Sequence, residues 1–308
     1  MHDGGRIGLV LHPGRDCSGA AAQVAAWTTT HGVDLVAGAA DVARLQLTGV
    51  RPVDVAELAD GCDGIIALGG DGTLLGAMRL VHAKPVPILG VNFGRLGFLA
   101  EVEARELDAA LTSMAEGRST IESRSCLVVC GPGWETVAFN DVVLARVPGQ
   151  GLVEATLSVA GRRYGRYKCD SLIVSSPMGS TAYNYAAGGP VMSPGAEGVL
   201  VTPSAPMTGI SRTLVIGPAE PLRLELTGGR PALELDGVSG GECSAGDELS
   251  VTVQPDAGLL VRIDDSRAAE RSRVKLSLLD LPVLPEELVE LVPDELRRHG
   301  PGGASEHG

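Results

Sequence analysis

The sequence "IIALGGDGTLLGAMRL", residues 65–80, joins an apolar run to a helical pattern through a turn of glycines. Residues 63–70 hold apolar side chains bounded by glycine, which predicts a buried strand. Apolar residues then recur at the spacing of one helical face: Leu74, Leu75, Met78 and Val81. A buried strand followed by a helix is the repeating unit of parallel sheets. The stretch therefore predicts an α/β domain, with Asp71 in the turn between the two elements.

Roughly the first 110 residues show the same alternation. Apolar runs at 6–14 and 86–92 predict two further buried strands, the first of them ended by Pro-Gly. Residues 18–32 are rich in alanine, begin with serine and end with glycine, as a helix would. Apolar strands separated by helices predict a doubly wound parallel sheet.

A different pattern begins near residues 116–125, where apolar and polar residues start to alternate. In residues 152–160 one face is apolar, and its members are Val153, Ala155, Leu157 and Val159. Similar runs, several of them bounded by Gly or Pro, lie at 135–147, 221–229, 231–238 and 247–256. This alternation is typical of half-buried strands, so we expect an all-β second domain.

These patterns divide the chain of 308 residues into three parts. We expect an α/β domain over 1–117, which carries the glycine turn, and a β-rich domain over 118–265. Residues 266–308 form a C-terminal segment that we expect to pack back on the first domain. A helix-like stretch at 284–300 precedes the tail in this last part, and the polar sequence "GPGGASEHG" at its end predicts disorder.

Charge and cysteine content narrow the classes of function. The formal net charge is −13, which argues against a protein that coats nucleic acid. The six cysteines form no CxxC pair and no Cys/His metal spacing, which favours reduced thiols in the cytoplasm. The sequence also lacks a signal-peptide pattern at its start and any run of about 18 apolar residues, so we expect no membrane span.

The glycine turn has the composition of a phosphate site. Glycines permit positive φ and close approach of a ligand, and the amides at a helix start favour an anion. We therefore expect phosphate to bind at Gly69, Gly70, Gly72 and Thr73. Neither the Walker nor the Rossmann glycine pattern is present. Asp71 would repel a bare phosphate, so it must face a magnesium ion or a hydroxyl group, and both roles suit phosphoryl transfer. Taken alone, Gly-Asp-Gly favours the simpler alternative of an aspartate N-cap.

A second candidate is the stretch 167–194, which contains Asp170, "GSTAY" and "AAGGP". It predicts a strand-to-helix turn with Ser180 or Thr181 as N-cap, and a helix of about two turns ended by glycines and proline. Tyr183 would offer a ring for stacking and a hydroxyl for hydrogen bonding. The alternative is that small residues here only allow close packing.

A third candidate is "AFNDVVLAR", residues 138–146, where two polar residues interrupt an apolar strand. Because adjacent strand residues point to opposite faces, either Asn140 or Asp141 must face inward or into a cleft. A ligand amide or ribose could supply the partner that a buried polar group needs. The alternative is a β-bulge in which the asparagine caps its own backbone.

Together these segments resemble the NAD kinases of the bacterial type, over about residues 5–290. The motifs that carry the resemblance are "GGDGT" at 69–73, "GVNFGRLGFLAEV" at 90–102, "FND" at 139–141 and "CDSLIVSSPMGSTAYNYAAGGPV" at 169–191, with a weaker "LDG" at 235–237. The first motif also occurs in diacylglycerol-type lipid kinases and relatives of phosphofructokinase, whereas the long fourth motif is far more specific.

The resemblance implies transfer of the γ-phosphoryl group of ATP, or of polyphosphate in some members, to the 2′-hydroxyl of the adenosine ribose of NAD. A divalent cation such as Mg²⁺ would accompany ATP. Asp71 would be the general base on that hydroxyl, and Phe98 would pack near the adenine. The full set of NAD-binding residues that it implies is Asp71, Gly72, Phe98, Asn140, Asp141, Lys168, Asp170, Thr181, Ala182, Tyr183 and Ala186. It further implies a β-sandwich-like second domain, a homodimer or homotetramer, and an Asp170 that meets the nicotinamide end of NAD from its own or a neighbouring subunit.

Some family positions differ in this chain. Ser171 stands where the family usually has glycine, Met178 where it has threonine, and Ala186 where it has serine. A downstream segment keeps Arg212 but lacks the usual histidine. These departures keep an alternative open, a diverged paralogue that phosphorylates NADH or another nucleoside-containing acceptor. A regulator without turnover is a further alternative, against which the retained Asp71 argues.

Overall fold

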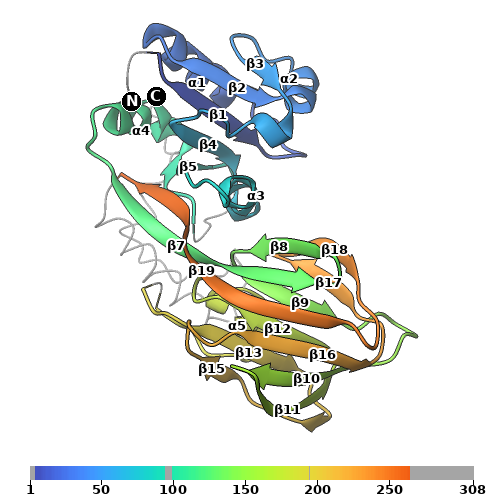
Figure 1. Cartoon of the computed structure of the whole chain (residues 1–308). Helices are drawn as coiled ribbons and strands as arrows, with labels where there is room; N and C mark the ends of the chain where they lie inside the picture. The colour runs from blue at the N-terminus through green and yellow to red at the C-terminus, as the bar shows by residue number, and fades with distance from the viewer. Residues whose placement is uncertain (1–3, 94–98, 194, 264–308) are drawn as a thin grey trace, which may run out of the picture. The chain divides into compact units, whose positions relative to one another are not determined.

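The structure is a computed structural model that describes residues 4–93, 99–193 and 195–263 (Figure 1). Contacts between residues group the chain up to Ile263 into one compact unit. The expected C-terminal segment, 266–308, and its tail lie outside the described residues. No helix in the described ranges is long and apolar enough to cross a membrane.

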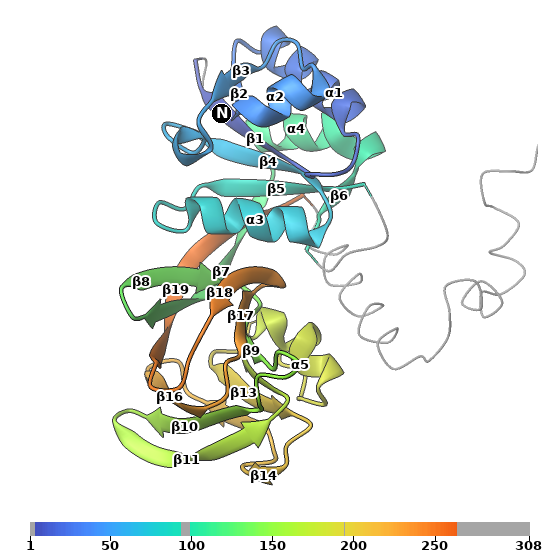
Figure 2. The same ribbon diagram turned by 90° about the vertical axis from the view of Figure 1, so that its right-hand side faces the viewer.

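The N-terminal part alternates strands with helices, as the apolar runs predicted. Its elements are β1 (Arg6–Leu11), α1 (Ser18–Thr30), β2 (Asp34–Gly38), α2 (Ala39–Leu45), β3 (Arg51–Val53), β4 (Gly64–Gly69), α3 (Asp71–Val81), β5 (Pro87–Asn92), β6 (Val102–Glu103) and α4 (Leu107–Ala115), with short 3-10 turns η1 (Val55–Glu57) and η2 (Ala104–Glu106). The four apolar residues expected on one face of α3 are all buried. Figure 2 shows α3 on one side of β4 and β5, and α1 and α4 on the other.

The second part is built of antiparallel strands. Its elements are β7 (Thr120–Gly131), β8 (Trp134–Ala138), β9 (Asp141–Ala145), β10 (Val153–Val159), β11 (Arg162–Cys169), β12 (Ser171–Ser175), η3 (Met178–Thr181), α5 (Tyr183–Ala186), β13 (Val199–Ser204), β14 (Thr208–Gly209), β15 (Leu214–Ile216), β16 (Leu222–Gly228), β17 (Ala232–Leu235), β18 (Val238–Glu242) and β19 (Glu248–Arg262). The apolar face expected for β10 is buried in the core between two sheets. Both halves of the predicted fold class, a doubly wound parallel sheet and an all-β sandwich-like domain, are therefore confirmed.

The strand order places the glycine turn at a change of direction in the parallel sheet. The strands run β3-β2-β1-β4-β5, all parallel, so the chain moves outward from β1 on one side and from β4 on the other. In open α/β sheets, ligands bind beyond the carboxyl ends of the strands at this switch point. Asp71 follows the carboxyl end of β4 directly.

One long strand belongs to both kinds of sheet. The first four residues of β19, 248–251, pair antiparallel with β16, and near its end Leu259 and Leu260 pair parallel with β5. β7 pairs with β19 along most of its length. The expected boundary near 117 falls just before β7 and stays a prediction.

Candidate active site

Asp71 is the first residue of α3 and directs its carboxylate to the segment that follows β5. Gly70, with extended φ and ψ of −96° and −167°, is the N-cap, and no side chain caps this helix. The Oδ1 atom of Asp71 instead accepts hydrogen bonds from Leu99 N at 3.1 Å and Ala100 N at 3.4 Å. The alternative of an aspartate N-cap is therefore wrong, and the half-buried carboxylate is oriented from outside its own helix.

Two properties of glycine were considered for this turn, positive φ and close approach of a ligand. Gly69, Gly70 and Gly72 do not adopt positive φ. A Cβ at Gly69 would lie 2.1 Å from Thr73 Oγ1, so that glycine allows close packing of the turn on its helix. A Cβ at Gly70 or Gly72 would meet nothing within 4 Å, so the chain is open at both positions. The turn is thus accessible to a ligand without backbone strain.

The turn at residues 139–141 is organised by Asp236, a residue that the sequence indicated only through the weak "LDG" motif. Its buried carboxylate accepts hydrogen bonds from three successive backbone amides, Phe139 N at 3.1 Å, Asn140 N at 2.6 Å and Asp141 N at 3.2 Å. Arg79 of α3 pairs with the same carboxylate at 2.6 Å. Asp236 therefore ties the helix that begins at Asp71 to the turn that carries Asn140.

Asp141 is a buried carboxyl group, 4% exposed, whereas Asn140 is half-buried. Burial, and to a smaller extent the nearby charge of Asp236, raise the pKa of Asp141 to about 7, against a hydrogen bond from the Tyr183 amide that lowers it. The expectation that one of the pair faces inward is met by Asp141. Its carboxyl group is partly protonated near neutral pH.

Stability should fall as the pH rises through the range in which Asp141 ionises. An aspartate in the unfolded chain loses its proton near pH 4, but Asp141 in the folded protein keeps its proton up to about pH 7. Between these values the unfolded state binds fewer protons, so the free energy of unfolding falls by on the order of a few kcal/mol and then levels off. Asp141→Asn removes this loss, and urea unfolding from pH 4.5 to 8.5 measures it.

The exposed variant Asp60→Asn serves as the control for the substitution in those measurements. Wild type and Asp60→Asn should both lose stability relative to Asp141→Asn as the pH rises. Parallel stability curves for all three proteins would contradict the assignment.

The "GSTAY" segment folds as a 3-10 turn, η3, followed by the short helix α5. The expected N-cap at Ser180 or Thr181 is wrong, because the N-cap of α5 is Ala182 and no side chain caps the helix. Ser180 is instead buried, and its Oγ accepts a hydrogen bond from Met192 N at 3.0 Å. The helix α5 is also shorter than the expected two turns, because it contains only four residues before the glycines.

Buried Asn184 holds this segment in place. Its Nδ2 donates to Ser180 O at 2.8 Å and Pro190 O at 2.9 Å, and its Oδ1 accepts from Thr202 Oγ1 at 2.6 Å. A Cβ at Gly179 would lie 2.0 Å from Asn140 O, so η3 packs directly on the 139–141 turn. The second and third candidate segments therefore meet in space, and close packing explains at least this glycine.

Tyr183 is more than one third exposed, and its hydroxyl donates to Ser171 Oγ at 3.3 Å. Ser171, where the resemblance leads one to expect glycine, thus supplies a partner for the tyrosine. Its neighbour Asp170 pairs with Arg146 at 2.9 Å, and Lys168 pairs with Glu154 at 2.7 Å.

The described contacts bring most of the expected residues into two linked groups. One is the turn at Asp71, and the other joins Asn140 and Asp141 to η3 and α5, with Arg79 and Asp236 as the link. Asp170 directly precedes Ser171, which bonds Tyr183 of the second group, and Lys168 stands two residues before Asp170. Thr181 and Ala182 are half-buried, Ala186 is exposed, and Phe98 lies outside the described residues.

Sequence reasoning also missed a cation at the switch point. Arg15 follows the carboxyl end of β1, and its Nη1 donates to Phe93 O at 3.0 Å, beyond the end of β5. Arg44 Nη2 donates to His12 O at 3.0 Å in the same loop. A basic residue in the loop after the first strand of a doubly wound sheet was the signal that could have indicated Arg15, whereas no sequence signal indicated Arg44 in α2.

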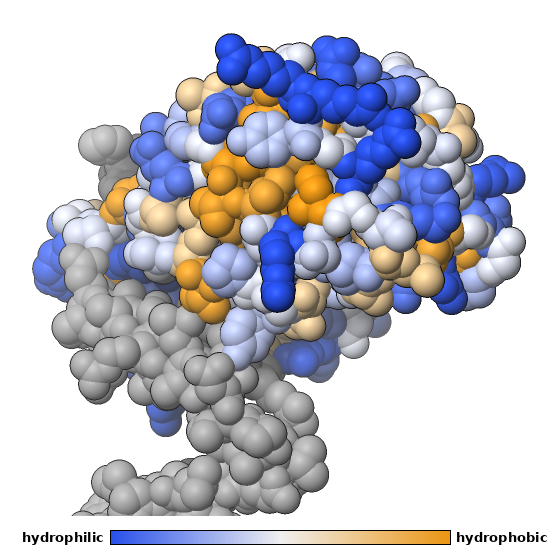
Figure 3. Space-filling view, turned by 90° about the horizontal axis from the view of Figure 1, so that it is seen from below, coloured by the Kyte–Doolittle hydropathy of each residue, from blue (hydrophilic) through white to orange (hydrophobic). Residues whose placement is uncertain are grey.

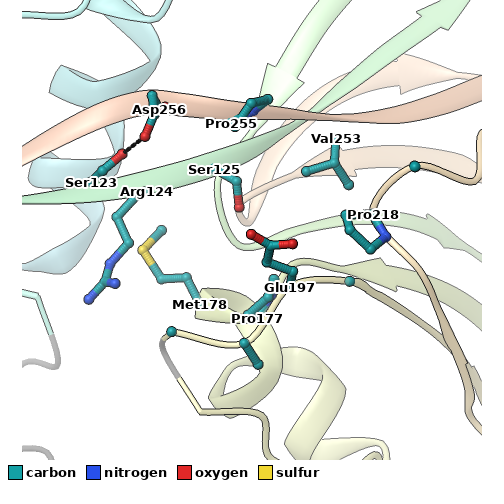
Figure 4. A pocket seen from close by; sticks show the side chains of 14 residues that line it. Ser123, Arg124, Ser125, Pro177, Met178, Glu197, Pro218, Val253, Pro255 and Asp256 are labelled. Carbon is teal, nitrogen blue, oxygen red and sulfur yellow. Dashed lines mark hydrogen bonds between the residues drawn. The ribbon is translucent and has the colours of Figure 1, made fainter.

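A pocket of about 420 Å³ lies beside the N-terminal end of η3 (Figure 4). Ser123, Val253 and Asp256 line it from β7 and β19, and Pro177 and Met178 from the start of η3. Met178 also packs against the core that contains Leu74 and Phe139. Met178, where the resemblance leads one to expect threonine, is therefore partly buried against the core and also forms an apolar wall of the pocket.

Comparison with known families gives two matches that together cover most of the chain. Residues 8–119 match the ATP-NAD kinase N-terminal domain, and residues 139–263 match the ATP-NAD kinase C-terminal domain. "NAD kinase 1" of Streptomyces avermitilis is 34% identical, over 90% of this chain and 88% of the relative. "NAD kinase" of Corynebacterium glutamicum is 35% identical, over 72% of this chain and 79% of the relative.

Two solved structures share the fold. Yeast NADH kinase in complex with NADH superposes with a TM-score of 0.79 at 21% identity, over 92% of this chain and 91% of that one. An NAD kinase from Archaeoglobus fulgidus in complex with ATP superposes with a TM-score of 0.67 at 22% identity, over 89% of this chain and 98% of that one. At these identities the likeness concerns the fold alone.

Proposed function

The chain belongs to the NAD kinase family, and from this premise we propose that it transfers the γ-phosphoryl group of ATP to the 2′-hydroxyl of the adenosine ribose of NAD, giving NADP. The observation that carries the proposal is the oriented carboxylate of Asp71, at the carboxyl end of β4 and beside two open glycines. The curated relatives are named NAD kinases, so the proposed acceptor is NAD rather than NADH.

In the proposed reaction Asp71 takes the proton of the 2′-hydroxyl. The ribose oxygen then forms a bond to the γ-phosphorus as the bond from that phosphorus to the oxygen of ADP breaks. A ribose hydroxyl is a poor nucleophile, so a carboxylate poised on its proton lowers the barrier. The phosphates would lie at Gly70, Gly72 and the first amides of α3, where the helix dipole favours negative charge.

A divalent cation such as magnesium would accompany ATP and neutralise phosphate charge. Among the described residues, no cluster of three His, Cys, Asp and Glu side chains has the arrangement of a metal site. Phosphate oxygens are ligands that magnesium prefers. We therefore propose that the phosphates of ATP hold the cation, and we assign it no side-chain ligand.

The acceptor would be held by the group around η3. Asn140, with its backbone fixed by Asp236, would hydrogen-bond the nucleotide, and Asp141 would support the turn from within. Tyr183 offers an exposed ring, and Thr181, Ala182 and Ala186 would line the same side. We retain Phe98, Lys168 and Asp170 as proposed NAD contacts.

We also propose a homo-oligomer. Figure 3 shows an apolar area on the face of the β-rich part. Four large apolar side chains of this part are more than half exposed among the described residues, Met207 at 68%, Val215 at 64%, Tyr164 at 61% and Val238 at 54%. Exposed apolar surface of this kind marks interaction sites in soluble proteins. The free thiols of all six cysteines suit the cytoplasm, which we propose as the location.

A panel of donors and acceptors tests the proposed function. The purified protein is incubated with Mg²⁺, with ATP or polyphosphate as donor, and with NAD, NADH or adenosine as acceptor. We expect NADP from NAD and ATP at a higher kcat/KM than any other acceptor supports. A clear preference for adenosine, which is not a dinucleotide, would contradict the proposal.

Gly70→Ala should separate folding from phosphate binding. Because a Cβ at Gly70 meets no other atom, we expect the free energy of unfolding to stay within about 1 kcal/mol of wild type. A methyl group at the point of close approach should raise the KM for ATP at least about tenfold. Gly69→Ala, which clashes with Thr73, is the control that should lose stability instead. An unchanged KM in folded Gly70→Ala would remove this glycine from the phosphate site.

A further inference from the structure

A buried ionic network lies beside the segment that orients Asp71. Arg262, the last residue of β19, is 8% exposed, and Glu101 is 2% exposed. Arg262 Nη1 donates to Glu101 Oε2 at 2.9 Å, and its Nε donates to Glu122 Oε2 at 2.6 Å. Glu122 also pairs with Arg124, so two arginines and two glutamates balance their charges. Buried charges of this kind persist only when their geometry satisfies each of them.

Arg262 also binds the backbone of the segment that contacts Asp71. Its Nη1 donates to Leu99 O at 3.1 Å. Leu99 O and Ala100 N belong to one planar peptide group, and a trans peptide points its carbonyl and its amide in opposite directions. The amide of this group donates to Asp71 Oδ1. The peptide is therefore held between a guanidinium on one side and the proposed catalytic carboxylate on the other.

Glu101 anchors the same segment at its next residue. Its amide donates to Gly90 O at 2.9 Å, and its Oε1 accepts from Ile263 N at 3.2 Å. Both of its carboxylate oxygens thus bind residues at the end of β19, which pairs with β5. The segment 99–101 is fixed by a strand more than 150 residues away in sequence.

We propose that Arg262 is a positioning residue for Asp71. By its hydrogen bond to Leu99 O it fixes the Leu99–Ala100 peptide, whose Ala100 amide helps the adjacent Leu99 amide to aim the carboxylate at the acceptor hydroxyl. The inference rests on the proposed role of Asp71, and it assigns Arg262 no contact with substrate. Glu101 and Glu122 hold the guanidinium in the orientation that this grip requires.

Amide hydrogen exchange tests whether Arg262 holds the Leu99–Ala100 peptide, and this measurement requires no enzymatic turnover. Arg262→Lys keeps the positive charge but cannot donate to Leu99 O, Glu101 and Glu122 together. We expect the amides of Leu99 and Ala100 to exchange at least tenfold faster than in wild type, and the amides of Leu89 and Val91 in β5 to exchange at unchanged rates. Unchanged exchange at Leu99 and Ala100 would overturn the proposal.

Kinetics test whether Arg262 acts through Asp71. Misplacing the carboxylate should lower kcat about 10- to 100-fold in Arg262→Lys, with the KM values for NAD and ATP within about twofold of wild type. In an Asp71→Asn background the same substitution should lower kcat no further, because the interaction it acts through is already gone. Additive losses in the double variant would overturn the proposal, since Arg262 would then act independently of Asp71.

Two further variants serve as a second test of the proposed role of Arg262 and as its control. Glu122→Gln, at a side chain that is 35% exposed, loosens Arg262 with less risk to folding and should change exchange and kcat in the same direction but less. Arg105→Lys replaces the arginine of an exposed ion pair and should change neither. If Asp71→Asn alone keeps wild-type turnover, the proposed function of Asp71 fails, and hydrogen exchange still decides whether Arg262 holds the peptide.

Discussion

Asp71→Asn should leave the protein folded and lower kcat with NAD by about 10²- to 10⁴-fold, the usual contribution of a general base. The substitution keeps the size of the side chain and an oxygen that can accept the hydrogen bonds from Leu99 and Ala100. It removes the negative charge that takes the proton of the ribose hydroxyl. The KM for NAD should change much less than kcat, because the acceptor is bound mainly by the group around η3.

Asp108→Asn is the matched control for this experiment. Asp108 lies exposed in the first turn of α4, as Asp71 lies in the first turn of α3, but it takes no part in the contacts described for the site. The control should keep wild-type turnover, and urea unfolding should show both variants folded. Near-wild-type turnover in Asp71→Asn would refute the proposed role of the aspartate.

Asp236→Ala should cost the protein about 3–5 kcal/mol of stability, the range for removing one partner of a buried ion pair. The side chain of Asp236 is fully buried, and its loss leaves three backbone amides and the Arg79 guanidinium without their acceptor. The backbone of Asp236 has a φ of 51°, in the left-handed region that aspartate and asparagine tolerate better than alanine. Urea unfolding at a fixed pH measures the loss.

Asp236→Asn separates shape from charge at this position. Asparagine keeps an acceptor oxygen and tolerates the left-handed backbone. The Asp236→Asn variant should therefore lose less free energy of unfolding than the Asp236→Ala variant. It should also lower the pKa of Asp141, because the nearby negative charge is gone. A loss below 1 kcal/mol in Asp236→Ala would contradict the view that this carboxylate organises the 139–141 turn.

The sequence predicted those parts of the fold that depend on local pattern. The buried runs at β1, β4 and β5 and the alternating run at β10 each produced the expected strand, because burial on one or both faces leaves a period in the sequence. The short α5 departs from expectation because tertiary contacts of Asn184, and not a serine or threonine cap, fix the end of η3.

The residues of the candidate site could be predicted from the sequence only where they belong to a recognisable motif. Asp71 and Asn140 stood out because polar groups interrupted apolar runs, and their roles stay predictions. Asp236 and Arg262 act through partners that lie 95 or more residues away in sequence. A single sequence contains no periodicity that reports such contacts, and only the folded structure shows which amides the two side chains organise.

The most direct test of the proposed function is the fate of the acceptor hydroxyl. The purified protein is incubated with ATP, Mg²⁺ and either NAD or an NAD analogue whose adenosine ribose lacks the 2′-hydroxyl, and the dinucleotide product is identified by mass spectrometry and phosphorus NMR. We predict a 2′-phosphorylated dinucleotide from NAD and none from the analogue. Absence of NADP with NAD, or phosphorylation of the analogue at an equal rate, would contradict it.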